Sequence, residues 1–292
     1  MKGIAEKVVV GYSWMSAFIL LGSVTVLGSY LVARGFGALD LELVFGDVHP
    51  VNAVLMKERV LSGLWPAIVG TFLLVITALV FAVPIGVASG IYLAEYGKGR
   101  IKSTLSLLFD ILASIPSIVV GLFGFSVAVF LHQNLSGRIY PCLLISALSL
   151  AFLVLPYIIR TTQISLESVP DGLRRTAPAL GASKLQNIRH VLLPRSLPAL
   201  LSGIILATGR CAEDTAVIML TGVVASAGIP ASLLDSYEAL PFYIYYISSQ
   251  YSNPDELAGG YGAALILLII CMLLFGVAFF AKNRFESRIS RL

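Results

Sequence analysis

The sequence predicts an all-α membrane protein with six transmembrane helices, and three observations support this fold class. Hydrophobic residues make up 58% of the 292 residues and charged residues only 12%, whereas soluble domains usually carry about 25% charged residues. Six apolar segments are each long enough to cross a bilayer as a helix, which takes about 20 residues. The Lys and Arg residues also gather in alternate connections between those segments.

The first apolar segment follows Lys2 and Lys7 and has the charge pattern of a signal peptide. Its apolar run is longer than the core of a signal peptide, which spans about 7–15 residues, so we expect an uncleaved first helix. The six predicted spans are residues 8–33, 67–94, 104–130, 139–159, 197–222 and 259–281.

Prolines and glycines mark features within two of these helices. Pro84 can kink the second helix, and Gly86 and Gly90 let a neighbouring helix approach closely. In the third helix, Pro116 breaks the backbone hydrogen-bond ladder near mid-depth. Asp110 lies near the start of that helix, within reach of water, and we expect it to hold a neighbouring loop.

The charge distribution orients the predicted bundle. With the N-terminus in the cytoplasm, 15 of the 20 Lys and Arg residues fall in cytoplasmic segments and Arg210 lies inside a helix. This asymmetry follows the positive-inside rule and predicts a multi-pass protein of the inner membrane with both termini cytoplasmic. The four basic residues outside are Arg34, Lys57, Arg59 and Arg138.

Two outer segments are long. Residues 34–64 show no clear periodicity. Residues 225–258 are rich in aromatic side chains, which favour the membrane–water interface. They form either an anchoring belt or a docking surface or lid for an external binding protein. The aromatic residues are Tyr237, Phe242, Tyr243, Tyr245, Tyr246 and Tyr251.

The longest basic stretch, residues 168–198, contains two short amphipathic helical patterns that meet at Gly181. Such a unit either lies on lipid headgroups or serves as a handle for a soluble partner. The apolar faces consist of Leu173, Ala177 and Leu180 in the first pattern and Leu185, Ile188 and Leu192 in the second.

Both patterns carry end signals. Asp171 and Ser183 are suited to cap the two helices, because their side-chain oxygens can accept hydrogen bonds from free backbone N–H groups. We expect Pro194 and Pro198 to end the unit, because proline cannot continue the hydrogen-bond ladder.

The fifth predicted helix carries charges at membrane depth. Arg210 lies 12 residues after Pro198, about 18 Å along a helix and close to the middle of a hydrocarbon core about 30 Å thick. Such charges usually face the bundle interior and mark a substrate path. Asp214 is one turn further on and is expected to pair with Arg210. Glu213 can share this pair, and Thr215 adds a hydroxyl.

Arginine suits an oxyanion path, because its planar guanidinium donates two parallel hydrogen bonds to phosphate or carboxylate. We expect carboxylates to hold Arg210 when the path is empty and to release it when an anion arrives. A purely structural ion pair between helices is the alternative.

No residues have the spacing of a catalytic or metal site. Cys142, Cys211 and Cys271 lie in apolar runs without a CxxC pattern. The chain also lacks the GxxxxGK[ST] phosphate loop of an ATPase. We therefore expect a transport subunit that is not an enzyme, binds no cofactor or metal and has no nucleic-acid partner. An ATP-independent channel remains an alternative.

The basic stretch resembles the coupling loop of bacterial binding-protein-dependent ABC importers. That loop reads Glu-Ala-Ala, three residues, Gly, nine residues and Ile-x-Leu-Pro, and Arg175 stands here in the Glu place. The resemblance implies that this segment contacts an ATPase subunit. The matching residues are Arg175, Thr176, Ala177, Gly181, Val191, Leu193 and Pro194.

Four further stretches are similar to the permeases of phosphate ABC importers of the PstA type. They are GIYLAEYG (90–97), IPSIVVGLFGF (115–125), LPYIIRTT (155–162) and GRCAEDTAVIMLTG (209–222). The family pattern in the last stretch is Arg, three residues and Glu-Thr-Ala-Pro. Arg210, Thr215 and Ala216 match it, Asp214 takes the Glu place, and Glu213 and Val217 replace Gly and Pro.

This resemblance implies a type-1 ABC importer (MetI-like) permease fold that forms half of a path for inorganic phosphate. The implied partners are a second permease of the PstC type, two ATP-binding subunits of the PstB type that hold ATP and Mg²⁺, and a phosphate-binding protein of the PstS type. An importer of another oxyanion, such as molybdate or sulfate, or of an organic anion is the alternative.

The predicted organisation has three parts. Residues 1–64 hold the first helix and its outer segment. Residues 65–282 form the permease domain, with the coupling loop at about residues 168–198. Residues 283–292 form a cytoplasmic tail.

Overall fold

The computed structural model describes residues 2–289 except residues 56, 59, 61 and 135–139. The described residues form helices and one isolated β-bridge, between Val223 and Tyr237. In this described part of the chain, six helical segments are long and apolar enough to cross a membrane, which confirms the predicted number. The longest helix of each segment is α1 (Lys2–Gly35), α4 (Trp65–Ile91), α6 (Ser117–Asn134), α7 (Leu143–Glu167), α10 (Leu193–Glu213) and α13 (Pro254–Ile289).

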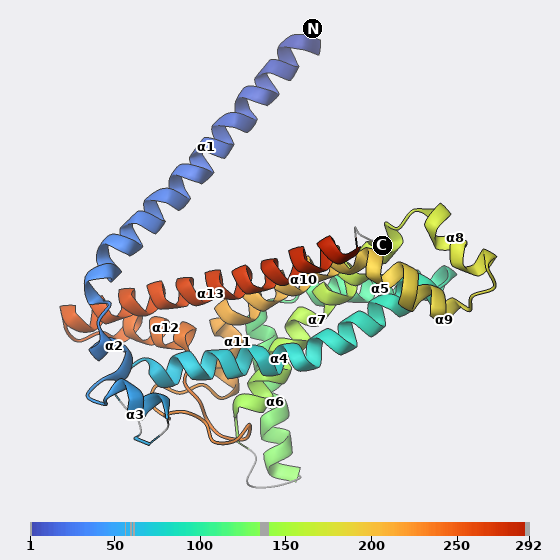
Figure 1. The fold of residues 1–292 in the computed structure, drawn as a ribbon. Coiled ribbons are helices and arrows are strands. Elements are labelled where there is room, and N and C mark those ends of the chain that lie inside the picture. The colour runs from blue at the N-terminus through green and yellow to red at the C-terminus, as the bar shows by residue number, and fades with distance from the viewer. Residues whose placement is uncertain (1, 56, 59, 61, 135–139, 290–292) are drawn as a thin grey trace.

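Shorter elements connect these helices at the two ends of the bundle. Figure 1 shows α2, α3 and α12 at one end, which we call the α12 end, and α8 and α9 at the other, the α8 end. The shorter elements are η1 (Phe36–Ala38), α2 (Leu41–Phe45), α3 (Pro50–Val54), η2 (Tyr92–Tyr96), α5 (Gly99–Ala113), α8 (Asp171–Ala179), α9 (Lys184–Asn187), η3 (Ile188–Leu192), α11 (Thr215–Thr221) and α12 (Leu240–Gln250).

Parts of the sequence predictions fall outside the described residues. They are the first residue of the predicted fourth span, Ile139, the last three residues of the predicted tail, 290–292, and the basic residues Arg59, Arg138 and Arg291.

Helix α7 lies at the centre of the apolar core, where Leu150, Val154 and Ile158 are buried. It packs closely against α4 because two glycines of α4 face it. A Cβ atom at Gly86 would lie 2.7 Å from Cγ2 of Ile158, and one at Gly90 would lie 2.5 Å from Cβ of Thr162. The predicted close approach at these two glycines is therefore confirmed.

Helix α1 extends away from the bundle (Figure 1), and none of its membrane span is buried. It meets α13 near its own C-terminal end. The rings of Tyr30 and Tyr261 lie edge to face with centroids 6.0 Å apart, and a Cβ atom at Gly35 would lie 2.7 Å from Cδ1 of Leu265.

The third predicted span, residues 104–130, is wrong as a single helix. The structure has α5 and α6 there, separated at Ser114–Pro116. Proline lacks an N–H group and disfavours helical geometry in the residue before it. Ser117–Asn134 alone forms the third segment with the length and apolarity to cross a membrane.

The fifth predicted span, residues 197–222, is also wrong as a single helix, because α10 ends at Glu213 and α11 begins at Thr215. Asp214 between them has extended backbone geometry, with φ −75° and ψ 112°. At its other end α10 begins earlier than predicted. Residues Lys184–Glu213 form one helical run through α9, the π turn η3 and α10.

The expectation that Pro194 and Pro198 end the basic unit is therefore wrong. Pro194 lies in the first turn of α10 and Pro198 lies inside that helix. In the π turn just ahead, the N–H of Leu193 bonds to the carbonyl of Ile188, one residue further back than in an α-helix. This shift accommodates the missing N–H and the ring of Pro194.

The two predicted helix caps have different outcomes. Asp171 does not cap α8: Pro170 is at the N-cap and Asp171 is the first helical residue. Ser183 caps α9, because its hydroxyl accepts from the N–H of Gln186 at 3.3 Å and the Gln186 side chain accepts from the Ser183 N–H at 2.8 Å. This reciprocal pair is a capping box.

The amphipathic faces of the basic stretch are only partly buried. Ile188 and Leu192 pack with Leu166 and Val169, as expected for an inward face. Leu185 does not join them and is 68% exposed.

Leu173 and Leu180 are also exposed, and Leu180 reaches 84%. Helix α8 therefore protrudes with part of its apolar face uncovered (Figure 1).

Candidate substrate path and coupling element

Arg210 lies in the last turn of α10, just before the helix breaks. The predicted pairing of Arg210 with Asp214 on one helix face is wrong, because the backbone leaves the helix at Asp214. The carboxylate of Asp214 instead accepts from the N–H of Val217 at 2.9 Å and caps α11. Within the described residues Arg210 forms no ion pair.

A cavity of about 160 Å³ lies beside Arg210, between α7, α10 and α13. Arg210 and Glu213 both line it, whereas Asp214 and Thr215 do not. The arrangement places a guanidinium with five N–H donors, which can bind an oxyanion, in one cavity with a carboxylate, which can accept only from an anion that carries a proton. The lining residues are Tyr157, Leu206, Ala207, Gly209, Arg210, Glu213 and Phe275.

Close packing of α13 on α10 shapes this cavity. A Cβ atom at Gly209 would lie 2.4 Å from the Phe275 ring, so α13 approaches α10 through a position without a side chain. Tyr157 and Phe275 were missed by sequence reasoning. Tyr157 lies in the LPYIIRTT stretch, but nothing in the sequence pairs it with α10.

The residues matched to the coupling loop lie in α8, the turn at Gly181, η3 and α10. Arg175 and Thr176 are exposed on α8 and Ala177 is half-buried. The half-buried Leu193 and Pro194 lie in the first turn of α10.

Gly181 joins the two predicted patterns with φ +84°, a left-handed geometry that favours glycine. The turn at Gly181 is therefore the joint between α8 and the run of helix that leads into the membrane.

Sequence reasoning missed the residues that attach α8 to the bundle. The carboxylate of Glu95, in η2, forms an ion pair with Arg174 of α8. The signal available in the sequence was a single carboxylate at the end of a long apolar helix, within the GIYLAEYG stretch.

A second polar chain joins α5 to α7. Nε and Nη2 of Arg160 donate to the two carboxylate oxygens of Asp110 at 2.7 and 2.6 Å. The chain continues from Arg160 to Gln163 (3.1 Å), Glu167 (3.0 Å) and Lys102 (2.6 Å). The predicted structural role of Asp110 is supported, but its partner is a helix and not a loop.

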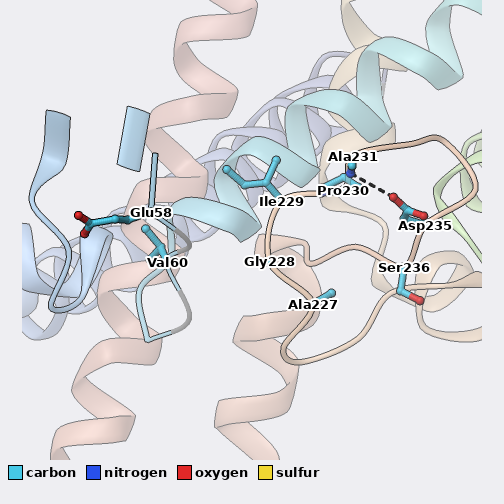
Figure 2. A pocket seen from close by; sticks show the side chains of 9 residues that line it. All are labelled: Glu58, Val60, Ala227, Gly228, Ile229, Pro230, Ala231, Asp235 and Ser236. Carbon is cyan, nitrogen blue, oxygen red and sulfur yellow. Dashed lines mark hydrogen bonds between the residues drawn. The ribbon is translucent and has the colours of Figure 1, made fainter. Parts of the chain in front are cut away.

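The α12 end carries a depression of about 440 Å³, shown in Figure 2. Glu58 and Val60 line one side and the loop 227–236 lines the other. In Figure 2 the carboxylate of Asp235 accepts from the N–H of Ala231, at 3.1 Å. Asp235 therefore holds the loop in shape.

Glu238 is buried directly behind this loop, 7% exposed, and accepts from the N–H groups of Ala227 and Gly228 at 2.9 and 2.7 Å. Burial raises the pKa of the Glu238 carboxyl, and the two N–H donors oppose this only in part. Tyr237 is fully buried, so it belongs to neither the predicted belt nor a docking surface.

Comparison with known proteins places the chain in a family. The family model described as "Binding-protein-dependent transport system inner membrane component" matches residues 82–291. The chain is 32% identical over 281 residues to the phosphate transport system permease protein PstA of Haemophilus influenzae, covering 96% of this chain and 95% of that protein. It is 36% identical over 258 residues to PstA of Yersinia pestis, covering 87% and 82%.

Solved structures of ABC transporters share the fold. A chain of a bacterial alginate ABC transporter, solved with an alginate pentasaccharide-bound periplasmic protein, matches with a TM-score of 0.65 at 16% identity, covering 93% of this chain and 94% of that one. A chain of the MetNI methionine ABC transporter matches with a TM-score of 0.56 at 20% identity, covering 77% and 97%.

These matches confirm the predicted type-1 importer permease fold, and with it a multi-pass membrane protein that works with ATPase and binding-protein partners and is not itself an enzyme. The chain belongs to the family of binding-protein-dependent transport system inner membrane components and, within it, to the PstA-type permeases.

Proposed function

We propose that this chain is a permease subunit of an ATP-driven importer of inorganic phosphate and forms half of the transmembrane path. The observation that carries the proposal is the guanidinium of Arg210, which lines a cavity between three membrane helices and has no ion pair within the described residues. A cation at membrane depth is costly unless an anion occupies its surroundings for part of the cycle. The similar permeases are named as parts of phosphate transport systems, and we therefore take this anion to be phosphate.

The proposed path extends beyond the cavity itself. Glu213 lines the cavity with Arg210. Asp214 and Thr215 lie at the helix break directly after it. We place these four residues next to the passing anion, with Arg210 as the binding group.

The α8 end is the proposed contact with ATPase subunits. The side chains of Arg175, Thr176 and Leu180 are exposed there on a helix that protrudes from the bundle. ATP and Mg²⁺ are bound by two partner subunits of the PstB type. Closure of those subunits would move α8 and open the path alternately to the two sides. The contact also includes Ala177, Gly181, Leu193 and Pro194.

The orientation proposed for the complex follows the basic residues. The α8 end, with Lys98, Arg100, Arg174 and Arg175, lies in the cytoplasm together with both termini. The α12 end faces a phosphate-binding protein of the PstS type. A second permease of the PstC type completes the path.

The test is phosphate-dependent ATP hydrolysis by the reconstituted complex with its binding protein. We expect phosphate to stimulate the wild-type complex, and Arg210→Gln to lower the stimulated rate at least about tenfold, since hydrogen bonds to charged groups contribute about 1.5–3 kcal/mol. Lys7→Gln, at an exposed position of α1, is the control. If phosphate stimulates the Arg210→Gln complex as strongly as the wild type, the proposed role of Arg210 is wrong.

A second outcome separates the substrate from the mechanism. If phosphate has no effect and sulfate or molybdate stimulates hydrolysis, the coupling proposal stands and the phosphate assignment is wrong.

A further inference from the structure

Glu95 occupies a joint where three elements of the α8 end meet. It lies in the π turn η2 that follows α4, and its side chain is 7% exposed. A carboxylate so deeply buried needs a compensating partner. Its partner comes from α8, 79 residues further along the chain.

Arg174 of α8 binds two other elements with one guanidinium. Nη1 donates to the carboxylate of Glu95. Nη2 donates to the carbonyl of Leu166 at 2.6 Å. Leu166 is in the last turn of α7, where helical carbonyls lack partners within the helix. Arg174 therefore ties α8 to the ends of α4 and α7 at the same time.

The beginning of the fifth membrane segment is attached to the same joint. Lys184 of α9 donates to the backbone carbonyl of Glu95, and its Nζ lies 4.3 Å from the centre of the Tyr96 ring, within cation–π range. The buried Asn187 donates to the carbonyl of Arg174 at 2.9 Å. Both ends of the Gly181 turn are thus held at Glu95.

The neighbouring Arg175 shows that these contacts are selective. Arg174 and Arg175 are adjacent on α8, but Arg175 is exposed and makes no ion pair within the described residues. One arginine faces the bundle and the other faces outward, where a partner can reach it.

We propose that Glu95 and Arg174 are the positioning pair that makes α8 move as one body with α4 and α7, so that a displacement of α8 reaches the substrate path. From the joint, α4 packs on α7 through Gly86 and Gly90, and one helical run of 30 residues leads from Lys184 to Glu213 at the cavity. The proposal rests on the proposed coupling of α8 to an ATPase and names residues within the permease that transmit it.

The test compares Glu95→Gln, Arg174→Gln and the double variant in the reconstituted complex with its binding protein. We expect each single variant to assemble with the ATPase subunits and to keep the basal rate of hydrolysis. We expect the phosphate-stimulated rate of ATP hydrolysis and the rate of phosphate uptake to fall at least about tenfold in each single variant. This is the size of effect that follows from removing one charged partner. The double variant should lose no more than either single variant, because the two residues act through one contact. Lys7→Gln, at an exposed position of α1, is the control and should match the wild type.

Several results would overturn the proposal. If phosphate stimulates ATP hydrolysis in either single variant as strongly as in the wild type, the pair has no part in coupling. If the losses of stimulated hydrolysis in the two single variants multiply in the double variant, Glu95 and Arg174 have independent roles. Failure of both single variants to assemble with the ATPase would show that the pair holds the fold and not the coupling. If the wild type responds to another anion, the same comparison is made with that anion, so a wrong substrate assignment does not hide the result.

Discussion

Arg210 and Glu213 line one cavity from positions three residues apart on α10. A guanidinium attracts any oxyanion, but a carboxylate beside it favours an anion that carries a proton to donate. Phosphate carries such a proton at neutral pH and sulfate does not. We therefore expect Arg210 to supply binding and Glu213 to supply discrimination.

Replacement of Glu213 by Gln should relax this discrimination. An amide can donate as well as accept, so a fully ionised anion is no longer opposed at this position. We expect sulfate to compete with phosphate uptake more strongly in Glu213→Gln than in the wild type, with phosphate uptake retained. Glu42→Gln, at an exposed position on α2, is the control. Equal competition in the wild type and Glu213→Gln would mean that Glu213 does not select the anion.

Because of Glu238, the free energy of unfolding should depend on pH. Because burial raises its pKa, the folded protein binds more protons than the unfolded chain between the ordinary carboxyl pKa and the raised one. Stability from this residue is therefore present at low pH and lost as the pH rises through that window. Glu238→Gln keeps an acceptor for the N–H groups of Ala227 and Gly228 and cannot ionise.

The measurement for Glu238 is the midpoint of thermal unfolding in detergent. We expect Glu238→Gln to unfold at a higher temperature than the wild type at about pH 7.5, with a smaller difference at about pH 5. A difference that does not change with pH would show that ionisation of Glu238 has no part in stability.

At the level of elements, the contact between α4 and α7 depends on the absence of side chains at Gly86 and Gly90. A Cβ atom at Gly90 would lie 2.7 Å from the carbonyl oxygen of Ile159, and a backbone atom cannot move aside as the end of a side chain can. The overlap therefore has to be relieved by separating the two helices.

We expect Gly90→Ala to destabilise the protein by about 1–3 kcal/mol, the usual cost of overpacking a core. A matched substitution is Gly28→Ala in α1, where a Cβ atom meets no other atom of the chain within 4 Å. It should leave the midpoint of thermal unfolding unchanged, while Gly90→Ala lowers it. Equal midpoints for the two variants would contradict the close packing of α4 on α7.

The sequence predicted the membrane helices better than their ends. Apolar length locates a span, but residues 104–130 and 197–222 each contain a break that length cannot reveal. Pro116 was recognised as a disruption, yet its effect, a new helix and not a kink, depends on the chain around it. Asp214 was interpreted as a partner of Arg210 because a carboxylate four residues on suits an ion pair as well as a cap.

The coupling residues show a similar limit. The Gly181 turn and the Ser183 cap were predictable, since both depend on local backbone chemistry. The joint at Glu95 was not, because it brings together Glu95, Leu166 and Arg174 from three separate parts of the chain.

At the scale of the whole molecule, the basic residues gather at the α8 end and predict which face lies in the cytoplasm. Cysteine labelling from one side of the membrane tests this orientation. Leu180 is 84% exposed at the α8 end, and Leu234 is 51% exposed in the loop at the α12 end.

In a background without Cys142, Cys211 and Cys271, we expect Leu180→Cys to react with an impermeant maleimide in inside-out vesicles and to be protected in right-side-out vesicles. Leu234→Cys should show the opposite pattern. The reverse result for both positions would invert the proposed orientation while leaving the fold unchanged.

The meeting of α1 with α13 has a consequence for biosynthesis. Tyr30 and Tyr261 are 231 residues apart in sequence, so α1 meets this contact only after α13 has been made. Contacts of such long separation form late in folding. Until then α1 has to reside in the lipid without support from its own chain, and its apolar surface allows this because none of its span is buried in the finished fold. Insertion of α1 can thus precede assembly of the bundle, and truncation before α13 would leave an inserted helix without this contact.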